Sequence, residues 1–271
     1  MNVTFVGGGN MANALIGGMI ARGFSAANIQ VIEVLSSARD RLTKQFGVRC
    51  APSAAQLEAL GEVIVMAVKP QQMREAAAAI GPKVGRAIVL SIAAGICLAD
   101  LSRWLGGATA LIRCMPNTPA LIGEGITAIY AQPGVDAARR ADAEVILAPA
   151  GKIVWLDSEA LLDPVTAVSG SGPAYVFYFI EAMQEAAIEL GLPPATARAL
   201  ALQTFRGATE LAARSEESPA ELRARVTSKG GTTEQALASF ERDHIKEAIR
   251  GGIRAANARA GELARQYGKD A

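Results

Sequence analysis

The chain has 271 residues, of which 51% are hydrophobic, and its formal net charge is +1 at pH 7. A chain of this length and composition buries a substantial core and is expected to form two domains. The nearly balanced charge offers no attraction to nucleic acid or to an anionic membrane surface, so we expect neither as a partner.

The chain opens with a strand, a glycine-rich turn and a helix. The three segments are an apolar run at residues 3–6, the turn Gly7-Gly8-Gly9-Asn10-Met11-Ala12, and a helical pattern at residues 13–22. Gly7 permits the tight turn, Gly9 lets a pyrophosphate approach the backbone, and Ala12 allows the helix to pack closely on the strand. Because the helix N-terminus faces the phosphates, this arrangement predicts a dinucleotide-binding loop; the alternative is a plain glycine-rich turn.

The second predicted strand, residues 29–32, ends at Glu33. An acidic residue at this place hydrogen-bonds an adenosine ribose and repels a 2′-phosphate, so Glu33 favours NADH. Ser36, Ser37 and Arg39 follow closely and are suited to hold a 2′-phosphate through hydroxyls and a guanidinium. In the alternative interpretation Glu33 is a solvated strand end and the residues after it cap the next helix. The choice between NADPH and NADH stays open.

Up to residue 160, short branched runs alternate with helical segments, which predicts a mostly parallel sheet covered by helices. The further predicted strands are residues 63–68, 87–91, 110–113, 126–130 and 152–156. Strand signals vanish after residue 160. The predicted fold class is α/β, with an N-terminal Rossmann-like, doubly wound sheet in residues 1–160 and an all-α dimerisation domain in residues 161–271.

Two helical stretches in the second part have large apolar faces. Residues 173–190 are apolar nearly all round, which predicts a helix that is buried on most sides. Between Ile245 and Tyr267, small and apolar residues recur at three- and four-residue steps and let another helix come close. These faces exceed what a domain of about 110 residues covers by itself, so we expect a dimer or a multiple of dimers.

Three polar segments end predicted strands at the sheet edge where a doubly wound sheet binds its ligands. They are Ala67-Val68-Lys69-Pro70, Ser91-Ile92-Ala93-Ala94-Gly95 and Met115-Pro116-Asn117-Thr118-Pro119. Pro70 fixes the backbone of Lys69 beside the expected nicotinamide half, although a plain surface cation is the alternative for Lys69. Asn117, between two prolines, is also typical of a turn.

The segment Thr227-Ser228-Lys229-Gly230-Gly231-Thr232-Thr233 lies between two helical stretches. Glycines let the backbone approach a ligand closely and turn its N–H groups inward, and flanking hydroxyls add donors. Such a loop suits a small anion such as a carboxylate. Together with a dinucleotide loop, it predicts a reductase that acts on a small acid.

Six blocks of the chain, in order, resemble the pyrroline-5-carboxylate reductase family. The blocks are Gly7-Gly8-Gly9-Asn10-Met11, Ala67-Val68-Lys69-Pro70, Ser91-Ile92-Ala93-Ala94-Gly95, Met115-Pro116-Asn117-Thr118-Pro119-Ala120, Ser169-Gly170-Ser171-Gly172-Pro173-Ala174-Tyr175 and Lys229-Gly230-Gly231-Thr232-Thr233. The resemblance implies reduction of the cyclic imine 1-pyrroline-5-carboxylate to L-proline by NADPH or NADH, the last step of proline biosynthesis. It also implies a helical domain that dimerises. The family frequently has a proline in place of Lys229, a departure expected to alter loop stiffness more than chemistry.

By this resemblance, Ser228, Gly230, Gly231 and Thr232 hold the substrate carboxylate. Thr233 also binds the substrate, through a hydrogen bond with the ring nitrogen, and is the expected catalytic residue. The residues expected to bind the cofactor are Gly7, Gly9, Asn10, Met11, Ala12, Glu33, Ser36, Ala67, Val68, Lys69, Pro70, Ala93 and Asn117. His244, the only histidine, lies outside these blocks and is expected to be a surface or capping residue.

Two other classes of protein stay open. One is a Rossmann reductase of the β-hydroxyacid dehydrogenase type, which needs a general base that the 227–233 loop does not supply. The other is a dinucleotide-binding regulatory protein without turnover.

Cys50, Cys97 and Cys114 are odd in number and scattered in apolar contexts, which favours buried free thiols over disulfides or metal ligands. We therefore expect no metal site and a home in the reducing cytoplasm. The longest apolar stretch, residues 87–99, is interrupted, and no signal-peptide pattern precedes the first strand, so neither a spanning helix nor a signal peptide is predicted.

Overall fold

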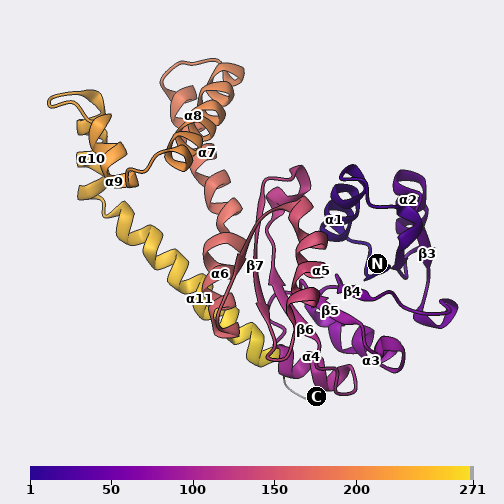
Figure 1. Ribbon diagram of the computed structural model, residues 1–271. Helices are drawn as coiled ribbons and strands as arrows, with labels where there is room; N and C mark the ends of the chain where they lie inside the picture. Colours follow the sequence, from indigo (N-terminus) through magenta and orange to yellow (C-terminus); the bar gives the residue numbers. More distant parts are fainter. Residues whose placement is uncertain (269–271) are drawn as a thin grey trace. The chain divides into compact units, whose positions relative to one another are not determined.

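The structure is a computed structural model that describes residues 1–268 (Figure 1). By its internal contacts the chain divides into two compact units. The first comprises Met1–Ser171 and the end of the last helix from Ala256 onward, and the second comprises Gly172–Ala255. The predicted division at residue 160, into a cofactor-binding part and a helical dimerisation part, stays a prediction.

The first unit is built on an eight-stranded sheet with the strand order β3-β2-β1-β4-β5-β6-β7-β8. The strands are β1 (Val3–Val6), β2 (Ile29–Ile32), β3 (Arg49–Ala51), β4 (Val63–Met66), β5 (Ile88–Ser91), β6 (Leu111–Met115), β7 (Gly125–Ala131) and β8 (Gly151–Trp155). Neighbouring strands are parallel except for the antiparallel pair β6 and β7. Together with the helical region that follows, this confirms the predicted α/β fold class.

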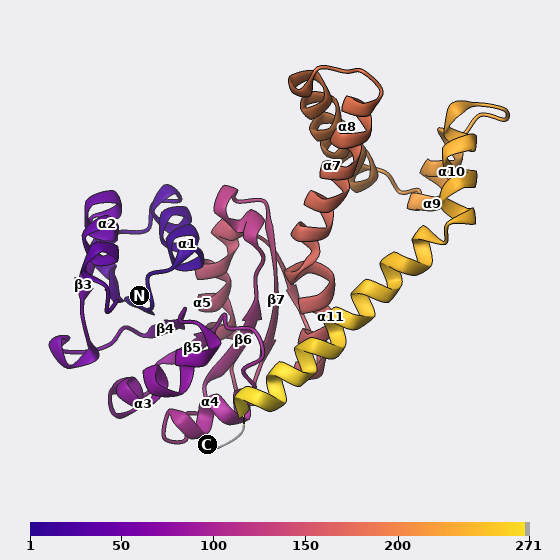
Figure 2. The same cartoon turned by 180° about the vertical axis from the view of Figure 1, so that it is seen from behind.

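Helices cover both faces of the sheet (Figures 1 and 2). On one face lie α1 (Asn10–Ala21), α2 (Ser36–Phe46) and α5 (Ala137–Leu147), and on the other lie α3 (Met73–Val84) and α4 (Leu98–Trp104). Successive residues of a strand point to opposite faces, so β4 supplies Val63 and Val65 to the first core and Ile64 and Met66 to the second. A strand that is buried on both faces needs a continuous apolar run, which is the pattern of β4. After β8, α6 (Leu162–Val165) and a π-helical turn (Thr166–Gly170) complete this part of the unit.

The second unit is all helical. Its helices are α7 (Gly172–Glu189), α8 (Pro194–Arg214), α9 (Pro219–Arg225), α10 (Thr232–Arg242) and the first part of α11 (Ile245–Gly268). In α7 only Ile180 is buried, whereas the side chains of Phe177 and Tyr178 are 64% and 69% exposed. The expectation that α7 is buried on most sides is therefore wrong for a single chain. The apolar face that its composition predicts is present, and within residues 1–268 it stays largely exposed.

All three cysteines are free thiols, as expected, and Cys114 is buried while Cys50 and Cys97 are half-buried. Burial raises the pKa of the Cys97 and Cys114 thiols, so neither is a reactive thiolate at neutral pH. Within residues 1–268, no group of His, Cys, Asp and Glu side chains is arranged to hold a metal ion. No helix in the same range is both long and apolar enough to cross a membrane.

Candidate active site

Four polar segments identified in the sequence meet at one edge of the sheet. Strands β1, β4, β5 and β6 are mutually parallel, so the segments that follow their carboxyl ends lie at the same edge. These segments are residues 7–9, 67–70, 92–95 and 116–119. Strand β2 lies on one side of β1 and β4 on the other, so the direction of the strand order reverses at β1. A doubly wound sheet binds its ligands at such a reversal.

The glycine-rich turn after β1 has the geometry of a phosphate-binding loop. Gly7 has φ +100°, and a Cβ atom there would lie 2.7 Å from the carbonyl oxygen of Ala67, so only glycine fits. Gly9 is the N-cap of α1, and a Cβ atom built on it meets no atom within 4 Å. The first turn of α1 has neither a side-chain cap nor an acidic residue. Its N–H groups are therefore open to an anion, and the loop fits the pyrophosphate of a dinucleotide.

The other predicted residues of this turn divide by exposure. Ala12 is fully buried, which allows the close packing of α1 on the sheet, whereas Asn10 is exposed and Met11 packs partly against the first core. Asn13, which the sequence motif does not include, donates from Nδ2 to the carbonyl oxygens of Gly8 and Gly9 at 3.1 and 2.9 Å. An amide side chain in the first turn of a helix that follows a glycine loop is the sequence signal for a residue that bonds to the loop backbone.

Glu33 joins the glycine turn to the end of β2. Its Oε2 accepts a hydrogen bond from the N–H of Gly8 at 2.8 Å, and its Oε1 accepts one from the N–H of Leu35 at 2.9 Å. The interpretation of Glu33 as a solvated strand end is therefore wrong. A carboxylate oxygen accepts more than one hydrogen bond, so Glu33 remains able to receive a ribose hydroxyl.

The residues after Glu33 are arranged differently from a simple cap. The N-cap of α2 is Leu35, which makes no side-chain cap, so Ser36 and Ser37 do not cap this helix; both are exposed in its first turn. Arg39 donates from Nη1 to the carbonyl oxygens of Glu33 and Val34, each at 2.8 Å. One nitrogen of this guanidinium is thus used by the backbone.

The loop after β4 begins on the sheet, since the N–H of Ala67 donates to Val6 at 2.8 Å. Ala67 and Val68 are half-buried, Lys69 is exposed, and Pro70 opens a short 3-10 turn, Pro70–Gln72. In the loop after β5, Ala93 is buried. Both loops place backbone groups at the edge predicted for the nicotinamide half, and the loop after β4 adds the exposed cation of Lys69.

Asn117 connects three segments. Its Oδ1 accepts from the N–H of Ile126 in β7 at 3.0 Å, and its Nδ2 donates to the carbonyl oxygen of Ser169 in the π-helical turn at 3.2 Å. The amide therefore holds the turn after β6 in place. A cofactor contact for Asn117 stays a prediction beside this structural role.

The hydroxyl- and glycine-rich loop belongs to the second unit, where it joins α9 to α10. Gly231 is the N-cap of α10, and its N–H donates to the carbonyl oxygen of Ser228 at 3.0 Å. Gly230 has φ +73°, and its N–H donates to Glu234 Oε2 at 2.6 Å. Thr232 and Thr233 open the helix, so their N–H groups have no intrahelical carbonyl partner. Together with the exposed hydroxyl of Ser228, they form a small cluster of donors that suits a carboxylate.

His244 lies in the turn between α10 and α11, is exposed and has φ +52°. It therefore stands at a helix junction, as the sequence predicts.

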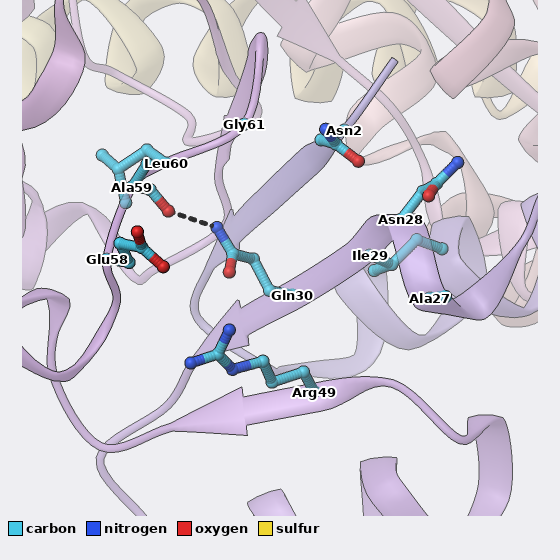
Figure 3. A pocket seen from close by; sticks show the side chains of 10 residues that line it. All are labelled: Asn2, Ala27, Asn28, Ile29, Gln30, Arg49, Glu58, Ala59, Leu60 and Gly61. Carbon is cyan, nitrogen blue, oxygen red and sulfur yellow. Dashed lines mark hydrogen bonds between the residues drawn. The ribbon is translucent and has the colours of Figure 1, made fainter.

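A hollow of about 280 Å³ lies at the opposite edge of the sheet (Figure 3). It is lined by Asn2, Ala27, Asn28, Ile29, Gln30, Arg49, Glu58, Ala59, Leu60 and Gly61. These residues precede or begin strands, and Gln30 Nε2 is already bonded to Ala59 O and Thr4 Oγ1 at 2.8 and 2.9 Å. The hollow is therefore remote from the strand ends at which a doubly wound sheet binds dinucleotides.

A doubly wound sheet with an uncapped glycine turn, followed by helices that carry a loop of exposed N–H and hydroxyl donors, is the arrangement expected of a dinucleotide-dependent reductase of a small acid. The family model "NADP oxidoreductase coenzyme F420-dependent" matches residues 2–95, and "Pyrroline-5-carboxylate reductase dimerisation" matches residues 159–263.

Relatives over the full length agree. The chain is 44% identical over 268 residues to the pyrroline-5-carboxylate reductase of Pseudomonas aeruginosa, with 98% of each chain covered. It is 40% identical to that of Synechocystis, covering 96% of this chain and 97% of the relative. A solved pyrroline-5-carboxylate reductase of Coxiella burnetii is 38% identical, has a TM-score of 0.90, and covers 97% of this chain and 98% of its own. The pyrroline carboxylate reductase of Plasmodium falciparum, solved with NADP bound, is 27% identical with a TM-score of 0.88 and the same coverage.

The chain belongs to the pyrroline-5-carboxylate reductase family, which confirms the resemblance found in the sequence. Neither a β-hydroxyacid dehydrogenase nor a non-catalytic regulator is favoured by these matches.

Proposed function

We propose that this chain reduces 1-pyrroline-5-carboxylate to L-proline with NADPH or NADH. The observation that carries the proposal is the start of α10, where the amides of Thr232 and Thr233 and neighbouring hydroxyls offer donors for a small carboxylate. Membership of a family of pyrroline-5-carboxylate reductases supplies the substrate class. We propose that residues 1–160 bind the cofactor and residues 161–271 bind the substrate and dimerise.

The fit of the glycine turn to a pyrophosphate supports NAD(P) as the cofactor. The proposed contacts are Gly7, Gly9, Asn10, Met11, Ala12, Glu33, Ser36, Ala67, Val68, Lys69, Pro70, Ala93 and Asn117. When bound, the reduced nicotinamide supplies the hydride, and the protein supplies binding and orientation.

The substrate loop performs two tasks in this proposal. Ser228, Gly230, Gly231 and Thr232 form the carboxylate site. The hydroxyl of Ser228 and the N–H of Thr232 are its donors, whereas Gly230 and Gly231 shape the loop, because their N–H groups are already bonded to Glu234 and to the carbonyl oxygen of Ser228. Thr233 Oγ1 accepts a hydrogen bond from the N–H of the protonated ring nitrogen and orients the imine. A protonated imine is already electrophilic, so orientation and the exclusion of water suffice without a strong catalytic acid.

An assay of NAD(P)H absorbance tests the proposal directly. We expect oxidation of NAD(P)H with pyrroline-5-carboxylate, and no reduction of NAD(P)+ with β-hydroxy acids. Turnover of hydroxy acids alone would point to a dehydrogenase, and cofactor binding without any turnover would point to a regulatory protein.

Glu33 is expected to set the cofactor ratio, because its carboxylate repels a 2′-phosphate. Glu33→Gln removes the charge but keeps an acceptor for the N–H of Gly8. At a partly solvated site the relief of repulsion is on the order of 1 kcal/mol, so kcat/KM should shift about fivefold toward NADPH relative to NADH. Glu33→Ser should shift the ratio in the same direction but also lower both values, because it releases Gly8. An unmoved ratio in both variants means that Glu33 does not face the ribose.

The chain self-associates through its helical region, which matches the dimerisation model of the family. We propose that the exposed apolar face of α7 forms this interface. Phe177→Glu places an unpaired carboxylate there, at a cost of about 3 kcal/mol, and should raise the dissociation constant about a hundredfold. Light scattering at micromolar concentration measures this, with Glu181→Ala, at an exposed polar residue of α7, as the control. A fully associated Phe177→Glu variant would place the interface elsewhere.

The three free thiols are compatible with a reducing compartment. On this basis we propose that the enzyme works in the cytoplasm.

A further inference from the structure

The last turns of α11 reach the loop that follows β4. Gln71 Nε2 donates a hydrogen bond to Tyr267 Oη at 2.9 Å, although 196 positions separate the two residues in sequence. Gln71 lies in the short 3-10 turn Pro70–Gln72, directly after Lys69. Both partners belong to the first unit, since α11 joins that unit from Ala256 onward.

The same helix end also packs against the loop that follows β5. Gly95 has φ +73°, and a Cβ atom built there would lie 3.3 Å from Leu263 Cβ, 3.3 Å from Tyr267 Cδ2 and 3.5 Å from the nitrogen of Ala264. These distances leave no room for a larger residue without a shift of the helix or of the loop. Tyr267 therefore touches one loop with its ring and binds the other with its hydroxyl.

Two further contacts fix the end of α11. The carbonyl oxygen of Gly268 accepts a hydrogen bond from Arg103 Nη2 in α4 at 3.2 Å, and Ala260 is buried. The side chain of Tyr267 packs against the second core, which also contains Met66 and Ala93. The helix end is thus a fixed support.

The two loops need such a support because the sheet stops short of them. The paired register of β4 and β5 ends at Met66 and Ser91. Beyond these residues, the N–H groups of Ala67 and Ile92 still donate to the carbonyl oxygens of Val6 and Met66. The later residues Gln71 and Gly95 are the ones that Tyr267 contacts.

We propose that Tyr267 is a positioning residue of the cofactor site, which acts through Gln71 and Gly95 to hold the two loops that receive the nicotinamide half of NAD(P)H. The proposal rests on the proposed function, in which Lys69, Pro70 and Ala93 contact the cofactor. It adds that the affinity for NAD(P)H depends on a residue of α11, which lies outside the segments that follow the strands.

Tyr267→Phe tests the hydrogen bond, because it keeps the ring against Gly95 and removes only the hydroxyl. One neutral hydrogen bond at an exposed position corresponds to a two- to fivefold rise in the Kd of NAD(P)H, measured by nucleotide fluorescence. Tyr267→Ala also removes the ring and should raise this Kd at least tenfold. The KM of pyrroline-5-carboxylate at saturating cofactor should stay within twofold of wild type in Tyr267→Phe.

Gln71→Leu approaches the same bond from the other side and should give the same rise in Kd. In the double variant with Tyr267→Phe, the rise should equal that of either single variant, because both remove one bond. Glu262→Ala is the matched control, since Glu262 lies on the same stretch of α11 and pairs with exposed Arg259 at 2.8 Å. It should bind NAD(P)H like wild type.

Wild-type affinity for NAD(P)H in Tyr267→Phe and Gln71→Leu, or additive effects in the double variant, overturns the proposal. A thermal midpoint that falls in Tyr267→Phe while the Kd stays at the wild-type value also overturns it, since this describes a purely structural contact. A wild-type protein that binds NAD(P)H and turns over no pyrroline-5-carboxylate contradicts the proposed function instead, and leaves the role of Tyr267 in cofactor binding to be decided by the same variants.

Discussion

Thr233→Val should lower kcat by roughly ten- to hundredfold and leave NAD(P)H binding unchanged. Thr233 is the second residue of α10 and is half-buried. Valine keeps the branched shape of its side chain and removes the hydroxyl alone. A neutral hydrogen bond at the reacting centre contributes about 1 to 3 kcal/mol to the barrier, so its loss appears in kcat.

Ser228→Ala should behave differently, because its proposed partner is the substrate carboxylate, which keeps its charge throughout the reaction. The loss of such a contact weakens the ground state and the transition state alike, so KM should rise more than kcat falls. Steady-state kinetics at saturating NAD(P)H compare the two variants. Ser239→Ala, further along α10, removes a hydroxyl outside the loop and serves as the control. Wild-type kcat in Thr233→Val would exclude Thr233 from the mechanism. Hydride transfer would then depend only on the positioning of the substrate and on protons from solvent.

The elements that carry the fold are predictable because their patterns are local. The strands at Val3–Val6 and Ile29–Ile32 coincide with the predicted runs, since each is a branched apolar run with a sharp end. Strand β3 escapes prediction. It has three residues, begins with exposed Arg49 and lies at the edge of the sheet, where no continuous apolar run is needed.

The candidate site is predictable only where its chemistry lies in short motifs. The glycine turn and the loop at the start of α10 are such motifs, and the structure places both at helix N-termini. The bond from Gly8 to Glu33 and the bonds of Asn117 join segments far apart in sequence. A single sequence holds no signal for such pairs, because many polar residues are equally eligible as partners. The exposure of α7 could not be predicted for the same reason. Its apolar composition predicts burial, but a single sequence does not say which surface covers the helix.

An ion-pair network around a buried arginine connects β6 to α4 and α6. Arg113 in β6 has a side chain that is only 5% exposed, and its Nη1 lies 3.1 Å from Glu159 Oε1. Its Nη2 lies 3.6 Å from Asp163 Oδ1 in α6. Glu159 Oε1 also accepts from the N–H of Leu98 at the start of α4, at 2.8 Å. The network therefore ties β6, α4 and α6 together.

Arg113→Met should lower the free energy of unfolding by about 3 kcal/mol, although methionine replaces much of the lost volume. The substitution leaves the carboxylates of Glu159 and Asp163 facing each other without a cation, at 25% and 27% exposure. Removing one partner of a buried pair typically costs about 3 to 5 kcal/mol, and the residual solvent access of both carboxylates favours the lower end. Urea unfolding at one protomer concentration measures the change, because association contributes to the apparent stability of a self-associating protein.

Two comparisons separate the lost charge pair from the lost side chain. Arg259→Met removes an exposed arginine from its pair with Glu262 and should change the stability by less than about 1 kcal/mol. Adding Glu159→Gln and Asp163→Asn to Arg113→Met removes the uncompensated charges, so the triple variant should recover part of the loss. If Arg113→Met costs no more than Arg259→Met, the network is not what holds β6 to α4 and α6. A large loss that the triple variant does not recover assigns the cost to packing around Arg113, since the carboxylates are then no longer charged.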